Sequence, residues 1–134
     1  MIHLDTSFLV DLLKEAARGI EGSASRFLAT VADEELGISV FVACELAAGA
    51  AMSTRPTQER RRVDQLCAGL HVEYPDERFP AAYGSLLALQ ERGKGRISTM
   101  DLLIATSALV AGAPLVTRNV KDFSRVPGLD VLSY

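Results

Sequence analysis

Hydrophobic and polar residues alternate along the chain in two patterns. Five short, mostly apolar runs predict β-strands, over residues 2–4, 36–38, 71–73, 114–117 and 129–132. The longer segments between them carry apolar residues three and four positions apart, which predicts helices over residues 6–14, 23–33, 40–52, 57–68, 76–91 and 98–110. Strands separated by helices pair in parallel through right-handed crossovers. The pattern therefore predicts an α/β fold, a three-layer α/β/α sandwich around a mostly parallel sheet of four to five strands.

Length and composition indicate a single globular domain over residues 1–134. Of the 134 residues, 49% are hydrophobic and 23% are charged, which is typical of a soluble protein. The net charge of −3 excludes a surface that is basic overall, although it permits a local basic stripe. No apolar run approaches the roughly 18 residues of a membrane span, and no signal-peptide pattern opens the sequence. We therefore expect a cytoplasmic protein without membrane association.

The two cysteines, Cys44 and Cys67, lie in apolar or helical segments. Their separation matches neither a disulfide framework nor a CxxC metal site. We expect both thiols to be buried and reduced, which fits a reducing compartment.

Two acidic residues, Asp5 and Glu45, directly follow predicted strands or lie early in the next helix. Asp5 could cap the helix after the first strand, although Thr6 or Ser7 could do so instead. Glu45 lies in a segment whose neighbouring positions are apolar or glycine. Removing its carboxylate from water requires a cation, either an Arg or a metal, unless the side chain faces solvent.

Two further acids, Asp101 and Asp122, have structural alternatives of their own. Ser98 and Asp101 match a capping box, with Asp in place of the usual Glu or Gln. Asp122 belongs to a polar segment after the fourth strand, where short Thr and Asn side chains can hold a tight turn. Each acid taken alone therefore permits a purely structural interpretation.

The predicted topology brings all four acids to one edge of the sheet. The carboxyl ends of parallel strands meet there, and ligands bind at that edge. Several carboxylates in one pocket cannot all remain ionised unaided, and a divalent cation removes the conflict. Oxygen ligands favour Mg²⁺, with Mn²⁺ as an alternative, over zinc. We expect Asp5 and Asp101 to be direct ligands, with Glu45 and Asp122 completing the ligand set or holding metal-bound waters.

These segments resemble a PIN-domain ribonuclease of the VapC toxin type. The matching pieces are Ile2-His-Leu-Asp5-Thr-Ser7, Ile38-Ser39 with Glu45-Leu46 and Gly49, Asp101-Leu-Leu-Ile-Ala105, Leu115-Val-Thr-Arg-Asn-Val-Lys-Asp-Phe123 and Val126-Pro-Gly-Leu-Asp-Val131. Their order and spacing cover essentially the whole chain. The resemblance implies the same parallel sandwich, with the four acids as the catalytic metal site. It also implies that Thr117 and Asn119 support that site, and we include Thr6 with them.

The resemblance further implies an activity and partners. Family members cleave RNA, often tRNA or rRNA, and a cognate antitoxin holds them inactive. We therefore expect a Mg²⁺- or Mn²⁺-dependent endoribonuclease toxin that hydrolyses RNA phosphodiester bonds. The expected partners are the RNA substrate, a VapB-type antitoxin and a second copy of the chain in a homodimer.

Basic residues around an acidic pocket are the expected contacts to the RNA backbone. Arg118 and Lys121 lie next to the proposed site in the sequence, and Arg60 and Arg61 belong to an Arg-rich helix. That helix could equally present a solvated, salt-bridged face. Lys94 and Arg96, in a predicted turn, are additional candidates. Aromatic residues make up only 6% of the chain, which argues against base stacking as the main contact.

Two other kinds of function fit part of the pattern. In a non-catalytic PIN-like binding module, the acids would act as caps and as an acidic pocket for an Arg of a partner. A phosphatase or receiver domain would use Asp5 as the phosphoryl acceptor. The phosphatase pattern requires a second Asp where Ser7 stands, and the receiver pattern requires paired acids near the first strand. The sequence lacks both.

Overall fold

The computed structural model describes residues 1–93 and 95–134, so Lys94 and its predicted role lie outside the described residues. The strands are β1 (Ile2–Leu4), β2 (Leu36–Ser39), β3 (His71–Glu73), β4 (Leu115–Val116) and β5 (Val131–Leu132). The helices are α1 (Thr6–Arg18), α2 (Ser23–Thr30), α3 (Val40–Ala51), α4 (Pro56–Cys67), α5 (Phe79–Arg92), α6 (Thr99–Ala111) and α7 (Val120–Phe123).

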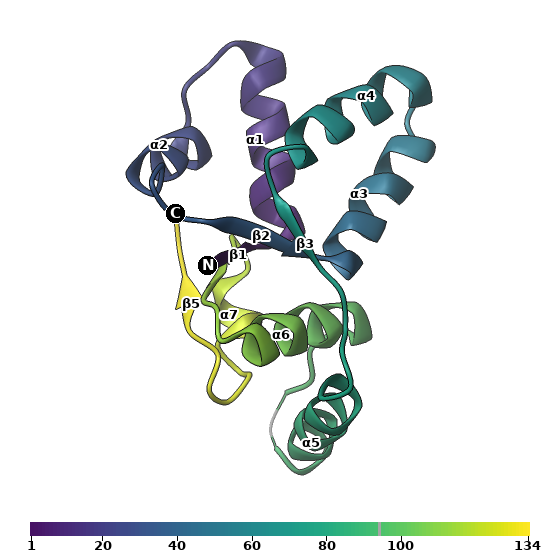
Figure 1. Cartoon of the computed structure of the whole chain (residues 1–134), viewed down its shortest axis with the longest axis vertical. Coiled ribbons are helices and arrows are strands. Elements are labelled where there is room, and N and C mark those ends of the chain that lie inside the picture. The colour runs from purple at the N-terminus through teal and green to yellow at the C-terminus, as the bar shows by residue number, and fades with distance from the viewer. Residues whose placement is uncertain (94) are drawn as a thin grey trace.

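The five strands form one parallel sheet in the order β3-β2-β1-β4-β5. Helices α1 to α4 cover one face of the sheet, and α5, α6 and α7 cover the other (Figure 1). The three-layer α/β/α prediction is confirmed. The chain runs outward from β1 to β2 and β3 on one side and to β4 and β5 on the other. The carboxyl ends of β1 and β4 therefore form a topological switch point, where such sheets bind ligands.

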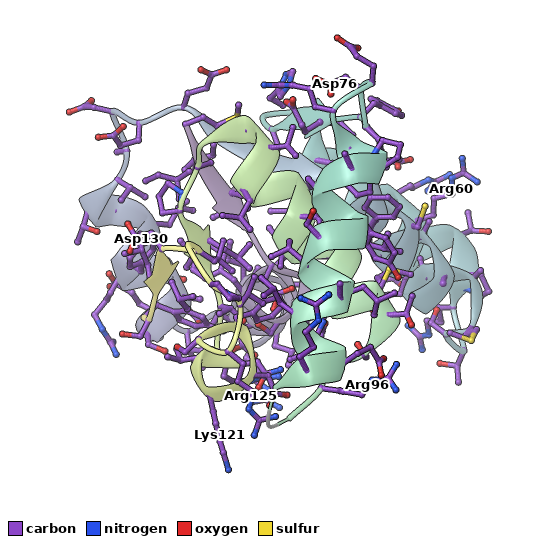
Figure 2. The ribbon with its side chains drawn as sticks, turned by 90° about the horizontal axis from the view of Figure 1, so that it is seen from below. Arg60, Asp76, Arg96, Lys121, Arg125 and Asp130 are labelled. Carbon is purple, nitrogen blue, oxygen red and sulfur yellow. The ribbon has the colours of Figure 1, made fainter. Side chains whose placement is uncertain are left out.

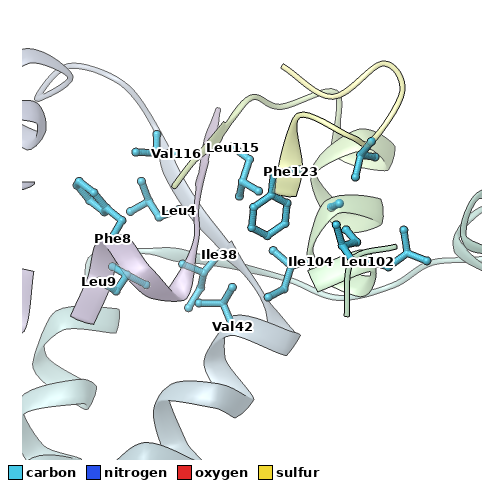
Figure 3. Close-up of a cluster of buried hydrophobic side chains, with 14 of the residues drawn as sticks. Leu4, Phe8, Leu9, Ile38, Val42, Leu102, Ile104, Leu115, Val116 and Phe123 are labelled. Carbon is cyan, nitrogen blue, oxygen red and sulfur yellow. The ribbon is translucent and has the colours of Figure 1, made fainter. Parts of the chain in front are cut away.

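The hydrophobic core lies on both faces of the central strands. Leu4 and Leu115 are buried within the sheet, while Phe8 of α1 and Phe123 of α7 pack from opposite layers (Figure 3). Fixing Phe123 in the core also fixes α7, which is only one turn long. The core therefore holds the segment after β4 against the end of the sheet.

Several helix boundaries differ from the predicted ones, and two of the differences have clear local reasons. Helix α1 continues one turn beyond the prediction and ends at Gly19, whose φ of 62° is the left-handed conformation that glycine adopts readily. Helix α5 begins at Phe79 rather than at residue 76. The Asp76 carboxylate accepts a hydrogen bond from the Arg78 backbone N–H at 2.8 Å, which stabilises a turn before the helix.

The two thiols are free, but Cys44 is exposed and Cys67 is half-buried. The prediction of two buried cysteines is therefore wrong. Helix α3 packs Val42, Leu46 and Ala50 inward, and Cys44 lies away from that side. In an almost entirely apolar helix, the sequence pattern does not distinguish the two faces.

The described helices are all shorter than a membrane span. The longest, α5, has 14 residues, and none in this part of the chain is long and apolar enough to cross a bilayer.

Candidate functional site

A polar cavity of about 370 Å³ lies at the carboxyl ends of β1 and β4. It is lined by Asp5, Thr6, Ser7, Glu45, Asp101, Arg118 and Asn119. Three of the four acids that the sequence singled out therefore share one cavity. Asp122 lies beside it and is hydrogen-bonded to the lining residue Asn119.

Asp5 is buried, and one oxygen of its carboxylate is held by two hydroxyl groups. Its Oδ2 accepts from Thr117 Oγ1 at 2.7 Å and from Ser7 Oγ at 2.9 Å. Asp5 occupies the N-cap position of α1, but its side chain makes no capping hydrogen bond. The N-cap interpretation is therefore wrong for this side chain. Its carboxylate is instead fixed at the wall of the cavity.

Glu45 is half-buried on α3 and is oriented from the neighbouring helix α1. Thr6 Oγ1 donates to Glu45 Oε1 at 2.6 Å. In the described part of the chain, Glu45 forms no ion pair with Lys or Arg. The apolar surroundings of Glu45 suggested either an Arg or a metal ion as its partner. Among the described residues, no Arg fills that role.

Asp101 lies in the first turn of α6, and its backbone rather than its carboxylate completes the helix cap. Ser98 Oγ accepts from the Asp101 N–H at 3.1 Å. Burial, followed by the negative charge of Asp5, raises the pKa of Asp101, and Glu45 and Asp122 act in the same direction. A hydrogen bond with the Ser98 side chain partly opposes this increase in pKa. The four acids therefore lie within electrostatic range of one another.

Asp122 is held on α7 by a short series of contacts from β4. Asn119 Nδ2 donates to Asp122 Oδ2 at 3.1 Å, and the Asn119 backbone N–H donates to Thr117 Oγ1 at 2.9 Å. Thr117 thereby contacts both Asp5 and the segment that carries Asp122. Arg125 Nη1 lies 3.5 Å from Asp122 Oδ1. The arrangement links the two sides of the cavity through a single buried threonine.

Three side chains that act beside the predicted site were not among the site residues expected from the sequence. Ser7 bonds Asp5 and also accepts from the Arg118 backbone N–H at 3.1 Å. Asp11 Oδ1 accepts from Arg118 Nη1 at 2.7 Å. Arg125 follows Asp122 at the i,i+3 spacing of a helical ion pair, which is a signal the sequence did contain. The contacts of Ser7 and Asp11 depend on a turn more than 100 residues away in the chain.

The basic candidates divide into two groups. Arg118 lines the cavity, and Lys121 is exposed on the same side of the molecule as Arg96 and Arg125 (Figure 2). Arg60 lies at another side and pairs with Asp64 at 3.8 Å (Figure 2). Arg60 and its exposed neighbour Arg61 do not line the cavity. The structure therefore brings Arg118, but neither Arg60 nor Arg61, to the acidic cluster.

The donor set consists of hard oxygen atoms. As the side chains stand, no three His, Cys, Asp or Glu residues of the described chain form a ready-made site for one ion. The cavity nevertheless has room for water, and Mg²⁺ keeps several waters and needs only one or two carboxylates as direct ligands. Burial is the main cause of the raised pKa of Asp101, and the neighbouring carboxylates add to it; a divalent cation would relieve this repulsion. The residues present therefore fit a hydrated Mg²⁺ or Mn²⁺ ion.

The chain is similar to known proteins at the levels of family, sequence and structure. The family model for the PIN domain matches residues 2–129. "Ribonuclease VapC1" of Haemophilus influenzae (strain R2866) is 32% identical over 126 residues, which cover 94% of this chain and 92% of the relative. "Ribonuclease VapC2" of Rickettsia felis is 33% identical over 94 residues, or 70% of each chain.

Two solved structures cover almost all of this chain. VapBC2 from Rickettsia felis, bound to a DNA fragment from its promoter, matches with a TM-score of 0.90 at 29% identity and covers 100% of this chain and 99% of that one. VapBC-1 from nontypeable Haemophilus influenzae matches with a TM-score of 0.85 at 29% identity, covering 99% and 98%.

Proposed function

The chain belongs to the PIN-domain family, and we propose that it is a divalent-metal-dependent endoribonuclease toxin of the VapC type. One observation carries the proposal: Asp5, Glu45 and Asp101 line a single polar cavity with Asp122 beside it. Among the described residues, none of the three lining acids has a Lys or Arg partner in an ion pair. Partly buried carboxylates without basic partners destabilise a fold, whereas a bound cation would offset their charge.

Asp5 and Asp101 are the proposed direct ligands of Mg²⁺ or Mn²⁺. Asp5 offers a carboxylate already oriented by Thr117 and Ser7, with Oδ1 free of hydrogen bonds to the described chain. Asp101 lines the same cavity from the first turn of α6. Glu45 and Asp122 would complete the ligand set or hold metal-bound waters, as Thr6 and Asn119 orient their carboxylates.

The proposed reaction is hydrolysis of an RNA phosphodiester bond, with tRNA or rRNA as the substrate class. The bound ion would polarise the scissile phosphate and lower the pKa of the attacking water. The residues of this chain contribute a fixed geometry, because side chains held by hydroxyl and amide donors lose little freedom on binding. Arg118 and Lys121 offset the negative potential of the carboxylates toward a polyanionic substrate.

A VapB-type antitoxin is the proposed partner that holds the enzyme inactive. The solved structures cited above are VapBC assemblies. A second cavity, of about 250 Å³, adjoins the acidic one, shares Thr6 and Glu45 with it and is otherwise lined mainly by apolar residues of α1, α3 and α4. An antitoxin segment with an apolar face and a basic side chain would fit this combination. The proposed homodimer would carry one such site in each copy.

The test is cleavage of total cellular RNA by the purified protein, with Mg²⁺ or Mn²⁺ and with EDTA. Asp5→Asn and Asp101→Asn remove one proposed ligand each with little change in shape. Asp130→Asn is the matched control, because Asp130 is exposed and lies apart from Lys121 and Arg125 of the cavity side (Figure 2). We expect discrete fragments that require metal, that both ligand variants reduce by roughly two orders of magnitude or more, and that the control leaves unchanged.

Other outcomes would contradict or narrow the proposal. Cleavage that persists in both ligand variants would place the activity elsewhere or in a contaminant. Absence of both cleavage and calorimetric metal binding would favour the binding module whose acidic pocket receives an Arg of a partner. Metal binding without cleavage of bulk RNA would exclude broad substrate specificity.

A further inference from the structure

Arg118 lines the cavity and is fixed at both its backbone and its guanidinium, although its side chain is exposed. Its backbone N–H donates to Ser7 Oγ at 3.1 Å, and its Nη1 donates to Asp11 Oδ1 at 2.7 Å. The Arg118 side chain remains 60% exposed, whereas that of Asp11 is 20% exposed. The anchor is therefore partly buried while the guanidinium still faces solvent.

Tyr134 in turn fixes Asp11. Its hydroxyl donates to Asp11 Oδ2 at 2.6 Å, so each carboxylate oxygen of Asp11 has its own donor. The Tyr134 ring packs edge-on against the buried Phe8, with 4.8 Å between ring centroids. Burial and the bond to Asp11 raise the pKa of Tyr134 well above its ordinary value, so the hydroxyl stays protonated and keeps donating. Arg118 is thus connected to the hydrophobic core through Asp11 and Tyr134.

The anchor places the guanidinium away from the metal ligands. Ser7 and Asp11 are four residues apart on α1, which corresponds to a rise of about 6 Å along the helix. Ser7 contacts Asp5 at the cavity wall, so a guanidinium held at Asp11 lies about one helical turn further out. A guanidinium group has five N–H donors, and the bond to Asp11 uses only Nη1 of Arg118. The other donors remain available for an anion.

We propose that Arg118 binds the RNA phosphate adjacent to the scissile one, and that Asp11 and Tyr134 are positioning residues for it. The inference rests on the proposed ribonuclease function and adds a subsite to it. A planar fork of donors recognises phosphate well, and its fixed orientation lowers the entropic cost of binding. The competing interpretation is a structural ion pair that only ties the segment after β4 to α1.

The two interpretations differ in what they predict for Asp11→Asn. This substitution removes a negative charge beside the RNA path, so simple electrostatics predicts tighter binding of RNA. Loss of orientation predicts weaker binding despite the more favourable charge. Tyr134→Phe provides a second variant, because it removes one hydroxyl and changes no charge.

The experiment measures binding of an end-labelled, mixed-sequence single-stranded RNA by fluorescence anisotropy over a series of salt concentrations at fixed Mg²⁺. Every protein carries Asp101→Asn, so that the probe is not cleaved. Arg78→Gln is the matched control: Arg78 is also an exposed arginine paired with a carboxylate, Asp76, which lies at the opposite edge of the molecule from Lys121 and Arg125 (Figure 2).

Arg118→Gln is expected to weaken binding roughly two- to fivefold and to reduce the slope of log K against log salt by about 0.7. Tyr134→Phe and Asp11→Asn are expected to weaken binding less, with unchanged melting of the fold, and Arg78→Gln is expected to have no effect. Tighter binding by Asp11→Asn, or an equal effect of Arg118→Gln and Arg78→Gln, would overturn the subsite while leaving the ribonuclease proposal standing. A parent protein that does not bind the RNA at all would overturn both.

Discussion

Thr117 connects two of the proposed ligands through a single hydroxyl. It is fully buried, donates to Asp5 Oδ2 and accepts from the Asn119 backbone N–H. Valine has nearly the same shape but cannot form either bond. Thr117→Val therefore leaves a buried carboxylate oxygen with one donor fewer and a backbone N–H without its acceptor.

We expect Thr117→Val to destabilise the fold by about 1–3 kcal/mol and to reduce metal-dependent RNA cleavage by roughly ten- to a hundredfold. Thr117→Ser keeps the hydroxyl and loses only a methyl group, so it should retain most of the activity. Denaturant unfolding and a cleavage assay on the same preparations check both expectations. Equal activity of the Val and Ser variants would show that Asp5 does not depend on this hydroxyl.

At the scale of residues, the sequence predicted the acids better than the groups that hold them. Asp5 and Glu45 were recognisable because each follows a strand or lies among apolar neighbours, where a charge needs an explanation. Ser7 and Asp11 look like ordinary polar positions of an amphipathic helix. Their partners are Arg118 and Tyr134, which only the folded sheet brings near α1.

At the scale of elements, the junction between α1 and α2 is stabilised by one carboxylate. Glu15, near the end of α1, is buried and accepts from the backbone N–H groups of Gly22, Ala24 and Ser25 and from Ser25 Oγ, at 2.6 to 3.1 Å. It satisfies the first amides of α2 from outside that helix. A side chain on Gly22 would collide with it, since an added Cβ would lie 2.5 Å from the Glu15 carboxyl carbon.

Glu15→Gln is expected to lower the stability of the fold at neutral pH. The Ser25 hydroxyl bond, helped by the three backbone bonds, lowers the pKa of Glu15 from 4.5 to about 2, while burial opposes this. Because the folded-state pKa is the lower one, the stabilisation is fully present above pH 4.5 and is lost as the pH falls toward 2. The stability difference between wild type and variant should therefore shrink over that interval.

The measurement is thermal unfolding at several pH values, with Glu21→Gln as control, because Glu21 is an exposed carboxylate in the same connection. A Glu15→Gln protein as stable as the control at pH 7 would contradict the role of this cap. The sequence could not have indicated it. An acid near the end of a helix usually faces solvent, and here its partners belong to the next element.

At the scale of the whole molecule, periodicity was sufficient to predict the layers but not the strand order. Alternating strands and helices require parallel crossovers, so the sandwich and the gathering of strand ends at one edge both followed from the pattern. The order β3-β2-β1-β4-β5 depends on which apolar faces pack together, and two-residue strands such as β4 and β5 carry little information about that. The expectation of buried cysteines failed for a related reason, because an apolar helix such as α3 does not reveal its exposed face.

The placement of β1 at the centre of the sheet has a consequence for the pH dependence of folding. His3 lies on this strand with 1% of its surface exposed, and its Nε2 has no hydrogen-bond partner among the described residues. Burial lowers the pKa of His3 below 6.5, with His71 and the terminal amine acting in the same direction and Glu73 opposing. The folded state therefore favours neutral His3, while the unfolded chain takes up a proton as the pH falls through 6.5.

The free energy of unfolding should consequently decrease as the pH falls from 7.5 to 5.5. His3 contributes at most about 1.4 kcal/mol per pH unit to this decrease. Asp101, whose raised pKa gives the opposite sign, is common to all the proteins compared. His3→Leu removes the titration and should flatten the pH dependence. His71→Gln, at an exposed position of β3, removes only a secondary contribution to the pKa of His3 and should preserve most of the pH dependence. Denaturant unfolding at the two pH values distinguishes these outcomes. A His3→Leu protein with the wild-type pH dependence would show that folding does not lower the pKa of His3.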